Sequence, residues 1–387
     1  MGEQAEYEER PCKCKCGQTF RARVSDPRRL FVNTIHANRF YRERDADGEI
    51  ENAAIALQTK RANGKMSALV READRLRTRV DELETLLDRY SFIKPEDTRV
   101  PAWLRSKKKT RAHRATPVLL LSDLHLDEVV DLAAMDGVNE YSREVAHQRF
   151  DRVINGSVDL LKNYRAGTHW DGIVAAFLGD ILTGVIHDEL ARTNEAPPSA
   201  SIVHWVPVLC SGLVYLADEL GRVHAPCVDG NHDRFYKQTP AKQRATSSLA
   251  WVVYNWMADH LRGDDRITFS ITESDEQLID VYDTTLLLSH GDAFRSQGGV
   301  GGLYPAMLKW LLRRHQFYSA TKRDFDLACI GHWHTDLYGP DFVVNNSLKG
   351  YDEYAKKLGF TFGRPGMQLF AVTPERGMSW RDFVHAD

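Results

Sequence analysis

Five short, mostly apolar segments of the chain each run directly into polar residues that can bind a metal ion. The segments cover residues 118–121, 172–178, 223–228, 284–289 and 327–330. Short apolar runs of this kind are typical of strands that are covered on both faces of a sheet. Between them lie segments with a helical spacing of apolar residues, such as 206–220, so the sequence predicts an α/β domain.

The polar residues at the ends of these segments form a set of candidate metal ligands. They are Asp123, His125, Asp180, Asn231, His290, His332 and His334. Taken singly, each has an ordinary structural explanation, such as a capped loop or a hydrogen-bonded imidazole in the core. Ligands of open α/β sheets gather outside the carboxyl ends of the strands, so five such ends would bring the set together. Imidazole and carboxylate donors suit Mn, Fe, Zn or Ni, whereas an all-oxygen site would suit Mg or Ca.

The composition excludes several other classes of protein. The 387 residues include 51 Lys and Arg against 54 Asp and Glu, a formal net charge of −3, so we expect no binding of polyanions through bulk charge. No apolar run reaches the roughly 18 residues of a membrane span, and no apolar stretch near residue 1 could serve as a secretory signal. We therefore expect a cytoplasmic protein with reduced thiols and no membrane partner.

Residues 1–40 contain three closely spaced cysteines, Cys12, Cys14 and Cys16, and His36 follows further along the chain. Three thiolates and one imidazole could complete a tetrahedral structural zinc site. The usual zinc knuckle has the spacing Cys-x-x-Cys, and the tighter Cys-x-Cys-x-Cys spacing crowds the ligands. A loop with incidental thiols is therefore the alternative interpretation of this segment.

Residues 41–92 have the pattern of a helical region with a heptad repeat. Apolar residues follow alternating steps of three and four from Met66 to Tyr90, and oppositely charged residues occupy the flanking positions. We expect residues 66–90 to form a homodimeric coiled coil or to pack against the rest of the chain. Residues 93–117 form a basic, proline-containing linker, either a solvated tether or a segment that contacts phosphates.

The ordered motifs resemble the signature of the calcineurin-like metallophosphoesterases: Asp-x-His, Gly-Asp, Gly-Asn-His-Asp or Gly-Asn-His-Glu, His, and Gly-His-x-His. The match covers residues 118–345. The resemblance implies that residues 118–387 form a two-sheet β-sandwich flanked by helices (αββα), with an N-terminal helical or coiled-coil extension. It also implies two metal ions, one on Asp123, His125, Asp180 and His334, and one on Asp180, Asn231, His290 and His332.

The resemblance implies that Asp180 bridges the two ions. Mn is the favoured identity of these ions, and Fe, Zn and Ni are the alternatives. Two ions about 3.5–4 Å apart can each bind a phosphate oxygen and convert the water between them into a hydroxide that attacks phosphorus. His232 would stand beside the substrate as the general acid for the leaving oxygen. Asp233 would either hold the His232 imidazole or cap the following helix.

Within the family the chain looks like the nuclease-type branch, in particular phage-encoded phosphoesterases of the DNA-repair-exonuclease type. The likeness rests on the run Gly-Asn-His-Asp-Arg that ends at Arg234 and on residues 346–354. The Asp-Arg-Gly ending of the phosphoprotein phosphatase motif does not follow Asp180, and Thr183 stands where double-strand-break repair nucleases commonly place an acid. The resemblance implies a DNA exonuclease, located in the host cytoplasm if the gene is phage-encoded.

Candidate substrate-binding residues carry positive charge, an imidazole or an aromatic ring. They are Arg234, Tyr236, His187, Arg295, Arg313 and Arg314, with Lys309, Trp310 and Lys349 as further candidates. Trp310 with Arg313 and Arg314 would offer a stacking face beside guanidiniums, or else belong to a helix with an apolar face and solvated charges. The alternatives to a DNA nuclease are a phosphatase or phosphodiesterase acting on small or cyclic nucleotides, and a non-catalytic scaffold that works through its N-terminal helix.

Overall fold

The computed structural model describes residues 6–14, 16–26, 28–42, 66, 70–78, 101–105, 113–238, 240–295 and 302–387. The chain divides into two compact units, residues 1–92 and 93–387, each of which is described by itself. In the smaller unit β1 (Tyr7–Pro11) pairs with the antiparallel β2 (Thr19–Arg23). Residues 34–42 and 70–78 are helical, and most of the predicted heptad repeat at 66–90 lies outside the described residues.

The first sheet of the larger unit has seven strands in the order β14-β13-β3-β5-β6-β7, with β4 paired to β3. The bounds are β3 (His113–Leu121), β4 (Thr168–Trp170), β5 (Ile173–Phe177), β6 (Val223–Cys227), β7 (Ile267–Ile271), β13 (Gly366–Thr373) and β14 (Gly377–His385). Strands β3, β5, β6 and β7 are parallel, whereas β13 is antiparallel to both β3 and β14. The carboxyl ends of β3, β5 and β6 therefore share one edge of the sheet.

The second sheet has five strands in the order β11-β12-β10-β9-β8. The bounds are β8 (Glu276–Val281), β9 (Thr284–Ser289), β10 (Leu327–Ile330), β11 (Leu337–Tyr338) and β12 (Phe342–Val344). Strands β9, β10 and β12 are parallel, and the two edge strands are antiparallel to their neighbours. This sheet also presents several carboxyl ends at one edge.

All five apolar segments of the sequence form strands, namely β3, β5, β6, β9 and β10, which confirms that part of the prediction. Residues 115–121 of β3 are buried throughout, as a run of aliphatic residues requires. The predicted linker at 93–117 ends earlier than expected, because β3 already begins at His113. Within the same segment the 3-10 turn η1 (Ala102–Arg105) buries Leu104 in the core, so η1 itself is folded against the domain.

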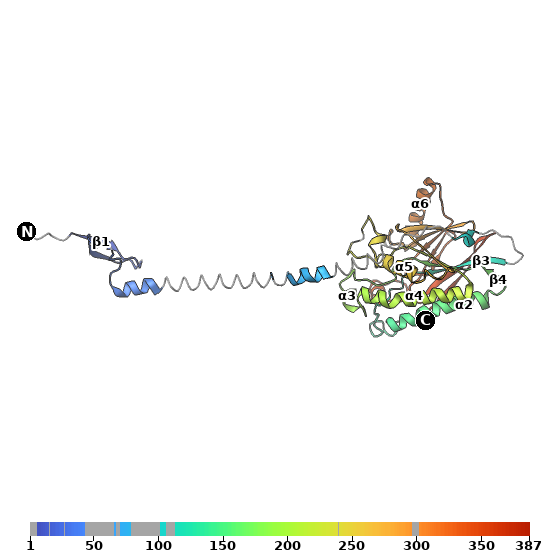
Figure 1. Ribbon diagram of the computed structural model, residues 1–387, viewed down its shortest axis with the longest axis horizontal. Coiled ribbons are helices and arrows are strands. Elements are labelled where there is room, and N and C mark those ends of the chain that lie inside the picture. Colours follow the sequence, from blue (N-terminus) through green and yellow to red (C-terminus); the bar gives the residue numbers. More distant parts are fainter. Residues whose placement is uncertain are drawn as a thin grey trace, which may run out of the picture. The chain divides into compact units, whose positions relative to one another are not determined.

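The two sheets pack face to face around a shared apolar layer. Val118 and Val174 of the first sheet belong to the same buried cluster as Leu288 and Cys329 of the second. The outer face of the first sheet packs beneath α2, α4 and α5, and the outer face of the second packs beneath α6. Figure 1 shows α2 and α4 on one side of the sheets and α6 on the other. The larger unit is therefore a mixed α/β domain with helices outside two packed sheets.

The helices of the larger unit begin at local sequence signals. Their bounds are α2 (Arg143–Asp159), α3 (Leu190–Thr193), α4 (Pro198–Leu220), α5 (Leu249–His260), α6 (Tyr304–Ala320) and α7 (Glu353–Leu358), with short turns η2 (Leu160–Tyr164) and η3 (Ala245–Ser247). The side chains of Ser142, Ser248 and Asp352 accept backbone N–H groups at the starts of α2, α5 and α7. Helices α4 and α6 instead carry proline in their first turn, where no hydrogen bond is lost.

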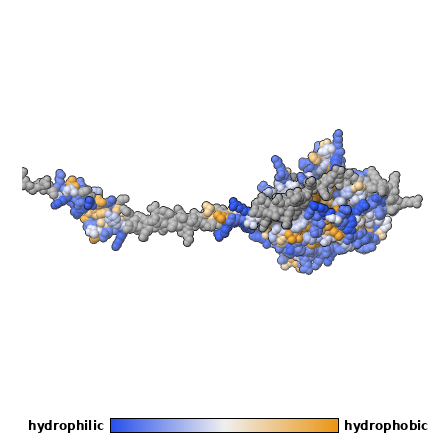
Figure 2. All heavy atoms as spheres, in the orientation of Figure 1, coloured by the Kyte–Doolittle hydropathy of each residue, from blue (hydrophilic) through white to orange (hydrophobic). Residues whose placement is uncertain are grey.

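Helix α4 is long and apolar enough, by length and composition alone, to cross a membrane, although the sequence was expected to contain no such segment. In its most apolar stretch 56 % of the residues are buried inside the protein, where α4 covers the first sheet between α2 and α5. Burial against a sheet also selects an apolar helix, and it accounts for the composition of α4. The face of the molecule in Figure 2 shows small apolar patches within a mostly hydrophilic surface.

Candidate metal centre

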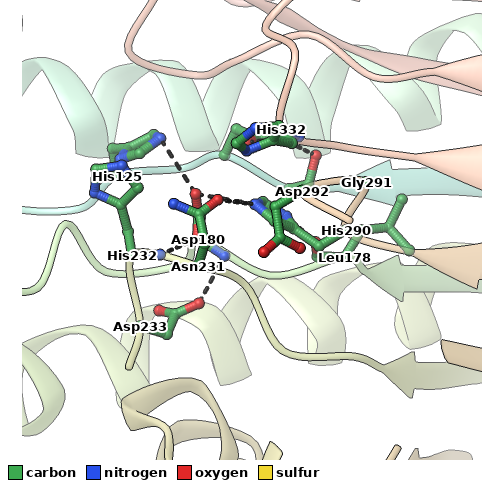
Figure 3. A network of polar contacts seen from close by, with 12 residues as sticks. His125, Leu178, Asp180, Asn231, His232, Asp233, His290, Gly291, Asp292 and His332 are labelled. Carbon is green, nitrogen blue, oxygen red and sulfur yellow. Dashed lines mark hydrogen bonds and ion pairs between the residues drawn. The ribbon is translucent and has the colours of Figure 1, made fainter. Parts of the chain in front are cut away.

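The seven predicted ligands all lie where strands end at the carboxyl edge of the two sheets. The first sheet supplies Asp123 and His125 after β3, Asp180 after β5 and Asn231 after β6. The second sheet supplies His290 after β9, and His332 and His334 after β10. Figure 3 shows how residues from both sheets surround Asp180.

Asp123, His125 and His334 form the first group of ligand atoms, which lie within 4.8 Å of one another. The Nε2 atoms of His125 and His334 are 3.1 Å apart, and His334 Nε2 is 3.3 Å from Asp123 Oδ1. The Asp123 carboxylate also accepts the backbone N–H of His332 at 2.9 Å and the hydroxyl of Ser122. These bonds from both sheets fix the orientation of the carboxylate.

Asp180, His290 and His332 form the second group, again within 4.8 Å of one another. His290 Nε2 lies 3.1 Å from Asp180 Oδ2 and 3.0 Å from Asn231 Oδ1, so the amide oxygen of Asn231 adjoins this group. The same Asp180 oxygen is 4.0 Å from Nε2 of His125 in the first group. Asp180 thus lies beside His125 of the first group and His290 of the second, as a bridging ligand would (Figure 3).

The hydrogen bonds of the imidazoles leave lone pairs directed at other ligand atoms. His290 Nδ1 donates to the Leu178 carbonyl at 2.7 Å, so the neutral ring carries its lone pair on Nε2, facing Asp180 and Asn231. Glu128 Oε2, 3.3 Å from Nδ1 of His125, favours the same tautomer there. A lone pair and a carboxylate repel at these distances unless a cation lies between them. The donor set therefore fits divalent cations.

The pKa shifts in this cluster also arise from imidazoles that face carboxylates at short distance. Burial opposes the charged form of the His290 imidazole, but the adjacent Asp180 carboxylate raises its pKa to about 10. Burial alone would raise the pKa of Asp180, yet the facing imidazoles of His290 and His232 hold it well below its usual value. A site that attracts a proton this strongly has the negative potential that a cation requires.

The backbone at these ligands is strained. Among the described residues, ten non-glycine residues have positive φ, and five of them are candidate ligands: Asp123, His125, Asp180, His332 and His334. Residues with a Cβ avoid this left-handed region, and such strain gathers at functional sites, where the surrounding structure enforces it. The concentration of strain therefore marks the same residues as the donor geometry does.

Two glycines allow the ligand loops to approach each other. A Cβ on Gly230 would lie 2.2 Å from both the backbone nitrogen and Oδ1 of Asp180. A Cβ on Gly331 would lie 2.7 Å from Oδ2 of Asp123. Only glycine fits at this distance, so the glycines of the Gly-Asn-His and Gly-His motifs are explained by close packing against carboxylates.

His232 lies beside the first ligand group, with its ring edge-on to His125 at a centroid distance of 4.8 Å. Its backbone N–H donates to Asp180 Oδ1 at 2.7 Å, and its Nδ1 donates to the Thr183 carbonyl at 3.2 Å. This leaves Nε2 as the atom that can accept or release a proton. Burial lowers the pKa of His232 to about 3, although the Asp180 carboxylate opposes that shift, so the ring is neutral in the free protein.

Asp233 has neither of the roles expected from the sequence. Its carboxylate accepts the backbone N–H groups of Asp180 at 2.6 Å and Leu182 at 3.1 Å, while Ser248 caps α5. His232 Nδ1 is bonded to a carbonyl instead. Asp233 is therefore a positioning residue for the Asp180 loop, and burial together with the Asp180 charge raises its pKa to about 8.

Two charged residues around the site, Lys349 and Glu128, are buried. On the sequence alone, Lys349 was assigned to substrate contact and Glu128 was not identified. Lys349, a candidate for substrate contact, is only 4 % exposed and pairs with Glu128 at 2.8 Å and Asp352 at 2.6 Å. Glu128 in turn faces His125 Nδ1, and although burial favours the neutral acid, Lys349 holds the pKa of Glu128 far below its usual value. The sequence signal that could have identified Glu128 is its position three residues after His125.

Arg244 joins two of the ligand loops. Its guanidinium bonds to Asp229 at 2.7 Å, ahead of Asn231, and to Asp292 at 2.8 and 3.1 Å, just after His290. The two aspartates flank predicted ligands, but nothing in the sequence pairs them with an arginine 15 residues from the first and 48 from the second.

The predicted substrate-binding residues divide into those that are exposed and those that are engaged elsewhere. His187, Tyr236, Arg295 and Arg313 are exposed, and the His187 ring lies 5.9 Å from that of His232. Arg234 instead donates to the carbonyls of Asn231 and Lys237 in its own loop.

Of the two interpretations of α6, the stacking face is wrong and the apolar face is correct, because Trp310 lies in the core. Trp310 is 4 % exposed and packs on Phe294 with ring centroids 5.2 Å apart. Arg314 pairs with the buried Glu276 at 3.1 Å. Trp333 also stacks on Phe294, with ring centroids 5.3 Å apart.

Comparison with known proteins gave distant structural likenesses only. No family model matches the sequence, and no curated protein matches it significantly. Sixteen chains of solved structures match. One is a conserved uncharacterized protein from Streptococcus pneumoniae TIGR4, described as a predicted phosphoesterase, with TM-score 0.24, 10 % identity and coverage of 70 % of this chain and 98 % of that one. Another is a dimetal phosphatase from Danio rerio, with TM-score 0.31, 10 % identity and coverage of 70 % and 99 %. Likenesses this distant say nothing about the reaction of this chain, which must be argued from its own residues.

Proposed function

We propose that the larger unit is a metal-dependent phosphodiesterase that holds two divalent cations. The ligands would be Asp123, His125, Asp180 and His334 for one ion, and Asp180, Asn231, His290 and His332 for the other. The observation that carries the proposal is the placement of Asp180 Oδ2 between His125 Nε2 and His290 Nε2, at 4.0 and 3.1 Å. A carboxylate in that position can serve two ions at once. The imidazole-rich donor set favours Mn, Fe, Zn or Ni, and Mn is the proposed ion.

Two divalent cations supply Lewis acidity for a phosphate group and lower the pKa of a water molecule in the site. The chain's own residues provide the geometry. Asp123 and Asp180 are held ionised and in fixed orientation by hydrogen bonds from both sheets. A phosphate anion beside His232 would oppose the effect of burial and favour the protonated ring. The proton on Nε2 could then pass to the leaving oxygen.

The proposed substrate is DNA, cleaved as by a nuclease or exonuclease. Exposed groups suited to a nucleic acid lie next to the ligands in the chain: His187 and Tyr236 follow Asp180 and Asn231, and Arg295 follows His290. Guanidinium groups contact phosphates, and aromatic rings stack on bases. His334, with 29 % of its side chain exposed, places one end of the ligand cluster at the surface, where a polymer could reach it.

Replacement of the bridging residue tests the proposed reaction. In the full-length chain, Asp180→Asn should abolish turnover of a chromogenic phosphodiester with Mn²⁺ and reduce the bound metal. Asp259→Asn is the matched control, because Asp259 is an exposed carboxylate on α5 that pairs with Arg262, three residues further along the chain. Full activity of Asp180→Asn would refute the bridging role.

A substrate panel tests the finer proposal separately. Linear, nicked and single-stranded DNA, RNA, cyclic nucleotides and phosphomonoesters would be assayed with Mn²⁺ at several salt concentrations. A nuclease should prefer DNA and lose affinity as salt rises. Preference for a cyclic nucleotide or a monoester would reject DNA while leaving the metal site intact, and turnover of no panel member would favour the scaffold alternative.

A further inference from the structure

The smaller unit brings four soft donor atoms together beside its hairpin. Cys14 Sγ lies 3.1 Å from Cys12 Sγ and 3.3 Å from His36 Nδ1. His36 Nδ1 is also 3.2 Å from Cys16 Sγ and 3.6 Å from Cys12 Sγ, and the four atoms all lie within 4.8 Å of one another. Because three thiols face the same imidazole nitrogen, the donors converge on one point rather than form separate pairs.

The local fold produces this convergence. The three cysteines lie in the loop that joins β1 to β2, and that loop is closed by a bond from Cys12 N to the Gln18 carbonyl at 2.9 Å. Gly17 has φ +79°, a left-handed conformation that turns the chain after Cys16. His36 lies in the first turn of the helix at 34–42, where Asn33 Oδ1 accepts its backbone N–H at 3.1 Å. The close spacing of the cysteines thus does not prevent their convergence.

The buried apolar core of this region is small. Among its described residues, the buried apolar side chains are Cys12, Phe20 and Ala22. A core of this size is too small for a stable fold, and domains below about 40 residues usually depend on disulfides, metals or oligomerisation. The three cysteines are free thiols in the structure. Lys13, in the hairpin loop, lies 5.8 Å from the ring centroid of Phe40 in the helix, and a bound metal ion would add a stronger link between the two.

We propose that Cys12, Cys14, Cys16 and His36 hold a structural zinc ion, in a site separate from the phosphodiesterase centre. Three thiolates and one imidazole form a common donor set of structural zinc sites. A tetrahedron with Zn–S bonds of about 2.3 Å has sulfurs about 3.8 Å apart, so the sulfurs of Cys12 and Cys14, which are 3.1 Å apart, would separate by about 0.7 Å when the ion binds. Soft thiolates disfavour Mg and Ca, and four protein ligands leave no open position, so the ion serves folding rather than catalysis.

Cobalt substitution tests the site in the full-length chain. Thiolate ligands give Co²⁺ a charge-transfer band in the near ultraviolet, whereas the donors of the phosphodiesterase centre are imidazole, carboxylate and amide. The wild-type chain should show the band. The triple variant Cys12→Ser/Cys14→Ser/Cys16→Ser should lose it together with one zinc ion per chain, and should keep its turnover of a chromogenic phosphodiester. Cys210→Ala is the matched control, since Cys210 is a buried thiol of the larger unit.

A second measurement avoids dependence on variants that fail to fold. Zinc released from the wild-type chain would be followed with a colorimetric indicator during titration with an organomercurial, which blocks thiols. Release of one zinc ion in step with the blocked thiols would support the site. Thiol blockage without zinc release, equal zinc content in the wild-type and triple-variant chains, or a wild-type cobalt spectrum without the band would overturn it. Each of these outcomes leaves the test of Asp180 unaffected.

Discussion

Addition of a single methyl group at Gly230 should disable the proposed metal centre without replacing any of its candidate ligands. A Cβ there would lie 2.2 Å from Asp180 Oδ1 and from the Asp180 backbone nitrogen, whereas ordinary contacts of a Cβ begin near 3.4 Å. The two loops must therefore separate by about 1 Å. Since one of the atoms is backbone, a rotation of the carboxylate alone cannot relieve the clash.

A displacement of that size has a large kinetic effect. A misplacement of about 1 Å in a catalytic group can cost on the order of 10²-fold in rate, or about 2.7 kcal/mol of transition-state stabilisation. We therefore expect Gly230→Ala to lower kcat/KM for a chromogenic phosphodiester by about 10²-fold. We also expect its metal content, measured by elemental analysis after dialysis, to fall.

The matched control is Gly263→Ala, because a Cβ at Gly263 meets no atom within 4 Å and its φ is not in the left-handed region. That variant should keep wild-type activity and metal content. Circular dichroism and thermal unfolding of both variants would separate a local displacement from a failure to fold. A folded Gly230→Ala protein with wild-type kcat/KM and full metal content would refute the argument from close packing.

Three further predictions concern other residues of the larger unit. His232→Ala should keep its metal but lose about 10²–10⁴-fold in rate, most for substrates with poor leaving groups; equal losses for good and poor leaving groups would argue against proton donation. Lys349→Met leaves the buried carboxylates of Glu128 and Asp352 without a cation and should cost about 3–5 kcal/mol in urea unfolding, so a loss below about 1 kcal/mol would contradict the buried pairing. Burial lowers the pKa of His224 to about 4 from the 6.5 of an unperturbed histidine. The unfolded chain therefore binds more protons in that window, and acidification from pH 7 to 4 should cost about 3 kcal/mol through this group. His224→Gln should remove that part of the pH dependence of urea unfolding, and superimposable wild-type and variant profiles would count against it.

The strands and the clustering of the candidate ligands were predictable because their signals are local. A strand covered on both faces requires consecutive apolar residues, as in residues 118–121, and the ligand follows within a few positions. The chain order of Asp123, Asp180, Asn231, His290 and His332 then follows the order of the strands. The arrangement of the sheets needed the structure, since nothing local says that β9 and β10 face β3 and β5 across a shared core.

The residues that support the candidate ligands could not be predicted, because their signals are not local in the sequence. The bond between Glu128 and Lys349 joins positions 221 residues apart, and a buried lysine is an uncommon choice that a sequence pattern assigns to the surface. The role of Trp310 stayed open in the sequence because its helix carries apolar and basic residues together, and only the packing against Phe294 decides which side faces inward. Asp233 was misassigned because adjacency in sequence to His232 does not imply contact between the side chains.

Because the candidate ligands are divided between two sheets, metal binding would affect the mechanical stability of the domain as well as its chemistry. Three of the ligands come from the second sheet and four from the first, so bound ions would cross-link the sandwich along a single rim. After chelation, carboxylates and imidazoles would be left facing one another across that rim, and the loops that follow β3, β5, β9 and β10 would exchange their amide hydrogens sooner than the helices outside. Resistance to proteolysis at those loops would then report how many ions the chain carries, independently of any substrate.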